Sequence, residues 1–428
     1  MMSKLKAVSP DAASLREETI RAVVDGTKRF HEIPEHYRAT EAAAIRREAL
    51  ERIAGCKLDA IGHHSFDANL AAKRNCENMI GVAQVPMGIV GPLTVHGEHI
   101  DGDVWVPMAT TEGALLASIN RGCAAIRQAG GAAVHVDDVG MTRAPVFRTG
   151  SHRETRAFLA WVRDHEEEIR SVASGTSRFL KLTEVRPYTF GTTIFLRFRF
   201  TTGDAMGMNM ATIACDRIVR DLIEPKTGVP CVALSGNYCV DKKAAAVNFN
   251  EGRGKRIHAE VVLDAPVLRE ILKTDAASLI EVQYRKNLLG SIAAGSMGYN
   301  AHFANVLSAV FLATGQDPAH VVGGSTGVTC IEPRPNGSVY ASIFIPDAPL
   351  GAIGGGTSLN TQSEALRILG VVPDPERPGR AAMRLAEIVG AAVLAGELSL
   401  MAAFTSSDLA RAHERLGRGG APDGERGA

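Results

Sequence analysis

Three short segments place a residue that can exchange a proton or stabilise a negative charge at the boundary of an expected element. In "MATTEG", Glu112 opens an apolar helix; in "SGNYCVDKK", Lys242 and Lys243 follow a strand; in "ATGQDPAH", Asp317 follows a long apolar helix. A carboxyl group can transfer protons, and an ammonium group can stabilise an oxyanion. Glu112 is also typical of a surface glutamate near a helix N-terminus, and the lysines are typical of a charged turn. Asp317 is the best candidate of the three, because an acid at a helix C-terminus opposes the partial charge there.

A fourth segment, "GDAMGMNMA", lies between a β-rich run and a helical run. Asp204 stands where the N-cap of the helix is expected, and Gly207 would let a flat ligand approach the backbone closely. Met206 and Met210 have the i,i+4 spacing of one helix face. Two interpretations are open: an N-cap followed by core methionines, or a helix N-terminus that binds a phosphate or pyrophosphate.

One familiar short motif also occurs, because "GGSTG" fits the GxSxG pattern of a nucleophile elbow with Ser325 as the nucleophile. That motif requires a strand, a sharp turn and then a helix, whereas the following "VTCIEP" is β-branched and reads as extended. A serine hydrolase is therefore only an alternative. The sequence contains neither GxGxxG nor GxxxxGK, so a dinucleotide would have to be bound by another device.

The composition is that of a globular protein of 428 residues, with 45% hydrophobic residues and equal numbers of basic and acidic residues, 47 each. A balanced charge gives no general argument for nucleic-acid or membrane binding. Seven scattered cysteines without a CxxC indicate reduced thiols, and the thirteen histidines form no ligand cluster, so we expect no metal. With no uninterrupted apolar run of about 18 residues and no signal-peptide pattern at the start, we expect a cytoplasmic protein without a membrane segment.

The middle of the chain reads as β-α-β-β-α-β, the order of the split βαβ or ferredoxin-like unit. Alternating or β-branched runs predict the strands, and amphipathic spacing predicts the helices. We expect a compact unit inserted within a larger domain. Its elements are a strand at 132–140 that continues into "APVFRT", a helix at 153–174, strands at 178–187 and 192–202, a helix at 210–224 and a strand at 230–236.

Long Ala- and Gly-rich apolar helices are expected on both sides of this insert, at 112–130, 288–315 and 380–404, and residues 11–54 also have helical periodicity. Because small residues let helices approach closely, we expect an α+β protein whose helix-rich large domain surrounds a central helix. The expected domains are an N-terminal helical region at 1–80, a large catalytic domain at 81–144 and 236–413, the small inserted domain at 145–235 and a flexible tail at 414–428.

Ten segments occur in one order along the chain: "ENMIG", "PMGIVGPL", "PMATTEG", "MTRAPV", "GDAMGMNMA", "SGNYCVDKKAAAVNFNEGRGK", "NAHFAN", "ATGQDPAH", "GGGTSLNTQ" and "AGELSLMAA". In these segments the chain resembles hydroxymethylglutaryl-CoA reductase, from about Glu77 to His413. It looks like the class that includes the eukaryotic catalytic domain, but without a membrane anchor. The resemblance implies reduction of the 3-hydroxy-3-methylglutaryl-CoA thioester to mevalonate and free CoA with two hydrides from a nicotinamide cofactor.

The resemblance also implies a catalytic set. Lys242 matches the lysine that stabilises the oxyanion, and Glu112 matches the acid that supplies a proton. A glutamate in the first turn of a helix would have a lowered pKa, so Asp317 is expected to raise the pKa of one carboxylate by sharing the site. His413 matches the histidine that protonates the departing CoA thiolate, on a mobile flap that closes over the substrate.

Substrate and cofactor residues follow from the same resemblance. Arg143, Ser235 and Lys243 match the positions that bind the free carboxylate of the substrate, and Asn305 matches a polar contact in the active site. Ser177 and Arg178 match the positions that hold a 2′-phosphate, so NADPH is expected in preference to NADH. The cofactor-binding segment itself contributes Asp204, Met206, Gly207, Met208 and Asn209.

The chain departs from the family pattern at two places. "SMGYN" has one glycine where members of this class have two, and the ending "LGRGG" has Gly419 at the position of a regulatory serine, so no kinase control through that serine is expected. A non-catalytic acyl-CoA-binding relative is a further alternative, although the retained Glu112, Lys242, Asp317 and His413 argue against it. We expect a homodimer or a higher homo-oligomer, with Glu77 near the neighbouring chain.

Overall fold

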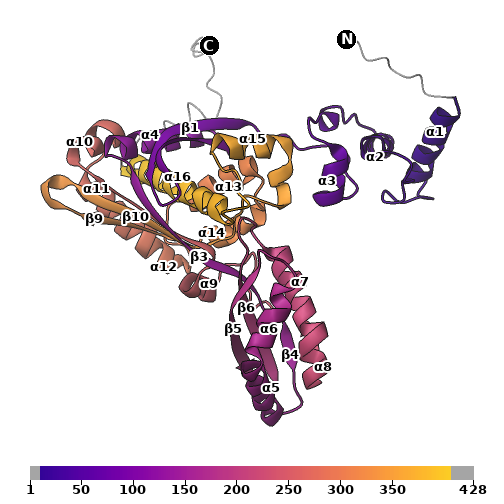
Figure 1. The fold of residues 1–428 in the computed structure, drawn as a ribbon. Helices are drawn as coiled ribbons and strands as arrows, with labels where there is room; N and C mark the ends of the chain where they lie inside the picture. The colour runs from indigo at the N-terminus through magenta and orange to yellow at the C-terminus, as the bar shows by residue number, and fades with distance from the viewer. Residues whose placement is uncertain (1–9, 406–428) are drawn as a thin grey trace. The chain divides into compact units, whose positions relative to one another are not determined.

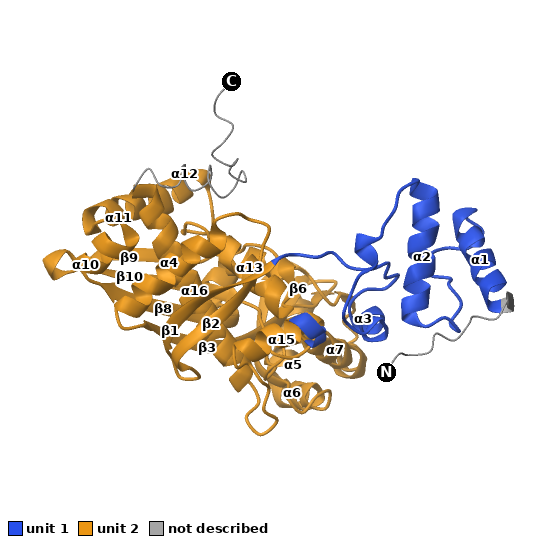
Figure 2. Cartoon of the chain, turned by 90° about the horizontal axis from the view of Figure 1, so that it is seen from above, with its two compact units in different colours: residues 1–86, 358–361 blue, residues 87–357, 362–428 orange. Residues whose placement is uncertain are grey.

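The computed structural model describes residues 10–405 and divides the chain into two compact units, shown in different colours in Figure 2. Unit 1 extends to Pro86 and includes Ser358–Thr361. Unit 2 contains Met87–Thr357 and the chain from Gln362 onward. All the segments that could carry chemistry lie in unit 2.

Unit 1 is helical, as its periodicity predicts. Apolar residues such as Ile20, Val23 and Ile45 recur at helical spacing and are buried in a small core. The second helix ends at Gly55, whose φ of 66° is the left-handed conformation that closes a helix most readily in glycine. The helices are α1 (Pro10–Val24), α2 (Ala39–Ala54), η1 (Ala60–Gly62) and α3 (Ala68–Arg74).

Unit 2 is built on a ten-stranded, mainly antiparallel sheet, counted over the described residues. Along its main path the strands follow the order β7-β4-β6-β3-β8-β10-β9, while β1 pairs with β2 and β3, and β5 pairs with β6. The strands outside residues 146–233 are β1 (Met87–His96), β2 (Asp101–Ala109), β3 (Ala132–Arg143), β8 (Arg253–Leu263), β9 (Val328–Pro333) and β10 (Val339–Ala348).

Helix α16 (Arg380–Thr405) lies within the large core of unit 2 (Figure 1). Small residues make its close packing possible: a Cβ added at Gly122 of α4 (Leu115–Gln128) would lie 1.9 Å from the Ala395 carbonyl oxygen. On the sheet side, a Cβ at Gly390 would lie 2.5 Å from Cγ2 of Ile257. Gly122 is therefore fixed by packing against α16, the central helix of the core, and Gly390 by the packing of α16 against Ile257.

The length and hydropathy of α16 satisfy a simple test for a membrane-spanning helix, although no uninterrupted apolar run of that length is visible in the sequence. Of the 18-residue window that passes, 83% is buried inside the protein. The apolar surface of α16 is therefore used by the core of unit 2.

The single helix expected at 288–315 is wrong, because the segment is interrupted. It forms η4 (Gln283–Gly290), α12 (Ser291–Ala294), an irregular stretch and α13 (Phe303–Thr314). Gly295, with a φ of 68°, ends α12, and Tyr299 then pairs with Val328 at the start of β9. The remaining helices are α9 (Ala246–Glu251), α10 (Ala265–Val267), η3 (Leu268–Leu272), α11 (Ala276–Val282), η5 (Pro318–His320), α14 (Val321–Gly324), η6 (Pro335–Gly337), η7 (Gly355–Ser358) and α15 (Asn360–Ile368).

Residues 146–233, called here the small lobe of unit 2, contain most elements of the expected insert in the expected order. The first expected strand is divided: its part at 132–143 is β3, which pairs with β8 outside the lobe, and its continuation is β4. The single helix expected at 153–174 is also divided, at His165. The strands of the lobe pair in the order β7-β4-β6-β5, all antiparallel, over an apolar core that includes Phe147, Phe158 and Phe198. Figure 1 shows its helices and strands grouped together, with α7 at the upper end of the group. The elements are β4 (Val146–Arg148), α5 (His152–Asp164), α6 (Glu166–Ser174), β5 (Lys181–Phe190), β6 (Thr193–Thr201), α7 (Met208–Ile218), η2 (Val219–Ile223), α8 (Glu224–Thr227) and β7 (Cys231–Ala233).

Candidate active site

The turn that carries Lys242 has an unusual backbone. Three residues that are not glycine have positive φ within six positions: Asn237 at 64°, Val240 at 46° and Lys242 at 58°. Positive φ is tolerated by asparagine but is an outlier for a β-branched residue such as valine. Such conformations cost roughly 1–3 kcal/mol each and persist where the surrounding structure imposes them, often at functional sites.

Lys242 forms an ion pair with Asp317, whose Oδ2 lies 2.7 Å from the lysine Nζ. The expected position of Asp317 at an unfavourable helix C-terminus is wrong: it is the N-cap of η5, and its Oδ1 accepts from the Ala319 N–H at 3.0 Å. Burial by itself would raise the pKa of Asp317, but the hydrogen bonds from Lys242 and from the Ala319 N–H hold that pKa below its ordinary value. Asp317 is therefore an ionised partner for the lysine.

Glu112 also lies outside the helix in which it was expected. Helix α4 begins at Leu115, and Glu112 precedes it in an exposed turn, so the helix-dipole argument for its ionisation does not hold. Both of its carboxylate oxygens accept hydrogen bonds from the Nδ2 of Asn305, at 3.1 and 2.9 Å. Asn305 lies in the first turn of α13 and is thus brought to Glu112.

The two carboxylates therefore have different partners, Asn305 for Glu112 and Lys242 for Asp317. The structure differs here from the expectation of a pair whose mutual repulsion raises one pKa, because the pKa of Asp317 is lowered by its own cation.

Arg143 and Ser235 meet at a buried cysteine. The Ser235 hydroxyl lies 3.4 Å from Sγ of Cys239, and the Arg143 guanidinium lies 4.0 Å from the same sulfur. Arg143 also donates to the Thr212 hydroxyl of α7 from Nε and Nη2, at 3.1 and 2.6 Å. Burial would raise the pKa of the Cys239 thiol, but the hydrogen bond from Ser235 and the positive charge of Arg143 hold that pKa below its ordinary value.

The fourth expected substrate residue, Lys243, is exposed, and its Nζ donates to the Asp241 carbonyl at 3.3 Å. The side chain of Asp241 points to buried partners instead: Oδ1 lies 2.7 Å from Nη2 of Arg253 and 3.0 Å from Nε2 of His320. Burial opposes its ionisation, but His320 and Arg253 hold the pKa of Asp241 well below its usual range. Because His320 ends η5 and Asp317 begins it, two neighbouring residues of the lysine turn are bonded to the two ends of η5.

The segment "GDAMGMNMA" has a different internal arrangement from the one expected. The N-cap of α7 is Gly207, with a φ of 97° and no side chain that caps the helix. Asp204 is buried, and its Oδ1 accepts from the Ala382 N–H in the first turn of α16 at 3.0 Å. Met206 lies before α7, so it does not share a helix face with Met210.

The rest of the expected cofactor site lies on α7 and on the turn before β5. Met208 is buried with Sδ 2.9 Å from Nη2 of Arg253, whereas Asn209 is exposed. Ser177 accepts from the Phe179 N–H at 3.2 Å, and the guanidinium of Arg178 lies over the Phe179 ring at 4.6 Å. Within the described part of the chain, no hydrogen bond or ion pair joins Ser177 or Arg178 to α7.

The nucleophile elbow is not realised as its motif suggests. Ser325 lies between helix α14 and strand β9, the reverse of the order that a nucleophile elbow requires, and its hydroxyl donates to the Val322 carbonyl at 3.0 Å. His413, which was expected on a mobile flap, and Gly419 lie outside the described residues.

Sequence reasoning missed several residues that support the site. Arg253 and His320 are each 1% exposed, and Asn248 is also 1% exposed. His320 stands in the same motif as Asp317, and Arg253 follows the lysine motif closely, but nothing in their spacing indicates burial. A charged or strongly polar side chain is rarely buried without a partner, so only the fold could identify them as supporting residues.

Comparison with known proteins gives a consistent result over the length of the chain. Residues 42–418 match the family model described as hydroxymethylglutaryl-coenzyme A reductase. The chain is 50% identical over 398 residues to the 3-hydroxy-3-methylglutaryl-coenzyme A reductase of Methanothermobacter thermautotrophicus, covering 93% of this chain and 98% of that protein. It is 41% identical over 408 residues to 3-hydroxy-3-methylglutaryl-coenzyme A reductase 1 of Arabidopsis thaliana, covering 94% of this chain and 68% of that protein.

Solved structures agree with the fold. The class II 3-hydroxy-3-methylglutaryl-CoA reductase of Streptococcus pneumoniae, solved bound to NADPH in open conformations, has a TM-score of 0.64. The match covers 91% of this chain and 97% of that chain at 16% sequence identity. At that identity the likeness establishes a shared α+β fold.

Proposed function

Since the chain belongs to the hydroxymethylglutaryl-coenzyme A reductase family, we propose that its Lys242–Asp317 pair is the centre of the thioester reduction. The protein is an oxidoreductase of the mevalonate pathway that converts 3-hydroxy-3-methylglutaryl-CoA to mevalonate. The observation that supports the centre is the 2.7 Å ion pair on a turn of strained backbone, which holds a cation beside an ionised carboxylate.

Conversion of a thioester to a primary alcohol is a four-electron reduction, and a bound nicotinamide cofactor supplies it as two hydrides. Each hydride addition to a carbonyl carbon moves the electron pair of the C=O bond onto oxygen. Lys242 stabilises that oxyanion, because its ammonium group is placed where the charge develops. Asp317 orients Lys242 through the 2.7 Å ion pair between its Oδ2 and the lysine Nζ.

The protons have two sources. After the first hydride transfer, the carbon–sulfur bond breaks, the oxygen lone pair reforms the carbonyl, and the CoA thiolate that leaves takes a proton from His413. After the second transfer, the alkoxide takes a proton from Glu112, which Asn305 orients through both carboxylate oxygens. Glu112 is exposed in its turn, so solvent can return the proton that it loses.

The free carboxylate of the substrate lies, in this proposal, against Arg143, Ser235 and Lys243. The planar guanidinium of Arg143 can donate two parallel hydrogen bonds to a carboxylate, and the exposed ammonium group of Lys243 adds a second positive charge. Arg143 now donates to Thr212 of α7, so its orientation is set by the same helix whose N-terminus is expected to face the cofactor.

The residues around α7 fit a pyrophosphate. Helix α7 has 11 residues, and its first N–H groups have no side-chain cap, so they can donate to an anion that the helix dipole also favours. Met206, Gly207, Met208 and Asn209 would line this contact, and Asp204 would hold the segment to α16. We extend the assignment to NADPH because Arg178 and Ser177 could hold a 2′-phosphate by charge-assisted hydrogen bonds, whereas the ribose hydroxyl of NADH offers no charge.

Two further parts of the proposal concern assembly and location. Glu77 is exposed in unit 1, as an interface residue of a homodimer or higher homo-oligomer would be in the single chain. The seven cysteines are all free thiols, as expected in the reducing cytoplasm.

A single assay separates this proposal from its alternatives. The protein is mixed with 3-hydroxy-3-methylglutaryl-CoA and either NADPH or NADH, and the absorbance of the reduced cofactor and the release of thiol are followed together. A reductase consumes two reduced cofactors for each thiol, a serine hydrolase releases thiol without cofactor, and a binding relative does neither.

The same assay tests cofactor choice. We expect a higher kcat/KM with NADPH, and we expect Arg178→Ala to raise the KM for NADPH while leaving the kinetics with NADH nearly unchanged. If the wild-type protein prefers NADH, or if Arg178→Ala weakens both cofactors equally, Arg178 is not a 2′-phosphate contact.

A further inference from the structure

The strained turn that carries Lys242 accepts a hydrogen bond from one buried asparagine. Asn248, in α9, is 1% exposed, and its Nδ2 donates to the Val240 carbonyl at 3.0 Å and to Oδ2 of Asp347 at 2.8 Å. Its Oδ1 accepts from Nη2 of Arg197 at 3.0 Å. Both hydrogens and the oxygen of this amide are therefore used.

The partners also fix the orientation of the amide. A guanidinium can only donate, so it must face the oxygen of Asn248, whereas a backbone carbonyl can only accept and must face the nitrogen. Rotation by 180° would place nitrogen against Arg197 and oxygen against Val240, and would lose these hydrogen bonds. Asn248 thus has one arrangement, and that arrangement holds the Val240 carbonyl.

Val240 is the residue of the turn that most needs such a restraint. Its φ of 46° is unfavourable for a β-branched side chain, and it stands two positions before Lys242. A backbone in a strained conformation relaxes unless surrounding contacts impose it. The hydrogen bond from Asn248 is a contact of this kind, because it acts on the carbonyl of the strained residue itself.

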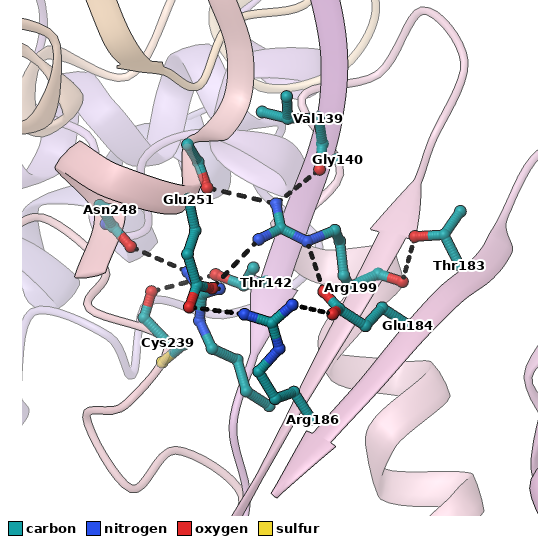
Figure 3. Close-up of polar contacts among 12 residues, drawn as sticks. Val139, Gly140, Thr142, Thr183, Glu184, Arg186, Arg199, Cys239, Asn248 and Glu251 are labelled. Atoms are coloured by element: carbon teal, nitrogen blue, oxygen red, sulfur yellow. Dashed lines mark hydrogen bonds and ion pairs between the residues drawn. The ribbon is translucent and has the colours of Figure 1, made fainter. Parts of the chain in front are cut away.

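The other end of the same amide reaches the small lobe. Arg197 lies on β6, is 2% exposed, and also donates to Oε2 of Glu251 on α9. Figure 3 shows Asn248 beside Glu251 and the guanidinium groups of Arg186 and Arg199, with dashed lines joining Glu251 to both arginines. Strand β6 is thereby joined to α9 by buried, charge-assisted hydrogen bonds.

From these contacts we propose that Asn248 is a positioning residue for the reduction: it fixes the left-handed turn that carries Lys242 and joins that turn to the small lobe through Arg197. The inference rests on the proposed catalytic role of Lys242. Asn248 touches neither substrate nor cofactor; it acts by keeping the ammonium group of Lys242 in place relative to a carbonyl that is presented with the cofactor from the small lobe.

The test compares the full-length variants Asn248→Ala and Lys242→Ala in the absorbance assay. We expect Asn248→Ala to lower kcat by about 10²-fold, the loss associated with a displacement of about 1 Å, and to change the KM for the CoA substrate by less than about threefold. A merely structural role would lower the melting temperature and the fraction of active protein without this separation of kcat from KM.

A second substitution provides a rescue that a general stability effect would not. In the Asn248→Ala protein, Val240→Asn places in the turn a residue that accepts positive φ more readily than valine does. We expect it to recover at least about tenfold of the lost kcat if the turn is the affected element. Where Asn248→Ala fails to fold, Asn248→Leu takes its place, because it fills the volume of the amide but has no hydrogen for the Val240 carbonyl.

Arg186→Gln is the matched control. Arg186 belongs to the same cluster and binds Glu251 at 2.8 Å, but it does not contact Asn248 and its side chain is 46% exposed. We expect its kcat to equal that of the wild-type protein. If Asn248→Ala keeps normal kcat while Lys242→Ala is impaired, or if Val240→Asn restores nothing, the positioning role is wrong. If Lys242→Ala is itself fully active, the proposed function of the lysine is wrong, whatever Asn248 does.

Discussion

Removal of the Lys242 ammonium tests the proposed chemistry most directly. In Lys242→Ala the oxyanion loses a charged donor, and loss of one such donor costs roughly 2.7–4 kcal/mol, or about 10²–10³-fold in kcat. The backbone contributes little to this difference, because lysine and alanine both have a Cβ and are strained alike at a φ of 58°.

A second effect adds to the first. Asp317 lies 2.7 Å from the ammonium group, so its carboxylate is left beside the developing oxyanion without a neutralising cation. Two like charges about 4 Å apart repel by about 1 kcal/mol in bulk water and by about 4 kcal/mol at an effective dielectric constant of about 20. The Asp317 side chain is 34% exposed, so the repulsion falls between these limits. We therefore take 10² as the lower bound of the loss in kcat.

The sign of the pH dependence distinguishes this account from a general loss of structure. Lys242 is a cause of the lowered pKa of Asp317, while burial acts in the opposite direction, so the pKa of Asp317 rises when the lysine is removed. Lowering the pH then protonates Asp317 in the variant and removes its repulsion. We expect the ratio of variant to wild-type kcat to increase as the pH falls from 7 towards the range in which carboxyl groups titrate, about pH 4–5.

Steady-state kinetics across this pH range check the prediction, with Lys243→Ala as a variant of the same turn and the same change of charge. Lys243 is assigned to the substrate carboxylate, so its removal should raise KM more than it lowers kcat, the opposite of the Lys242 result. Turnover of Lys242→Ala within about threefold of wild type would remove the lysine from the mechanism, since no oxyanion donor has so small an effect. A ratio that does not change with pH would refute the role given to Asp317.

Two other predictions concern parts of the protein outside the lysine turn. His413→Gln should slow reduction of the CoA thioester far more than reduction of free mevaldehyde, because only the thioester releases a thiolate; equal slowing of both substrates would contradict that role. Analytical ultracentrifugation should give at least twice the mass of one 45.4 kDa chain, with Glu77 close enough to the neighbouring chain for a cysteine placed there to cross-link; a fully active monomer would contradict the expected homo-oligomer.

Local patterns predict the elements of this protein well. Alternation in "TTIFLRFRFTT" predicts β6, and the amphipathic run from Arg153 predicts one helix where the structure has α5 and α6, because both patterns reflect burial on one face. Boundaries are less certain: helix α4 begins three residues after Glu112, and Asp317 is the N-cap of η5, so the helix-dipole argument does not hold for Glu112 and is reversed for Asp317. The polarity of a helix end changes within one turn, so a small error in a boundary changes the sign of the expected effect.

Support of the site depends on contacts between distant residues, which a single sequence does not reveal. Asn248 meets Arg197 across 51 positions, Arg143 meets Thr212 across 69, and His320 meets Asp241 across 79. Their neighbours in the sequence do not indicate which distant residue each of them contacts. The burial of two opposite charges or of an amide becomes favourable only when the fold brings the partners together.

Different residues of the segment "GDAMGMNMA" have different roles in the folded chain. The buried Asp204 is joined across 178 positions to the start of α16, and its carbonyl accepts from the Ala352 N–H at 2.7 Å. A Cβ at Gly207 would lie 2.3 Å from Cγ2 of Thr202, so that glycine is required by packing as well as by its positive φ. Asp204 therefore anchors the segment to the central core and Gly207 fits it against Thr202, while the first N–H groups of α7 have no side-chain cap and Asn209 is exposed. A helix end can serve as an anion site only if its position is fixed, so in the proposed cofactor site the same nine residues would supply both the anchor and the donors.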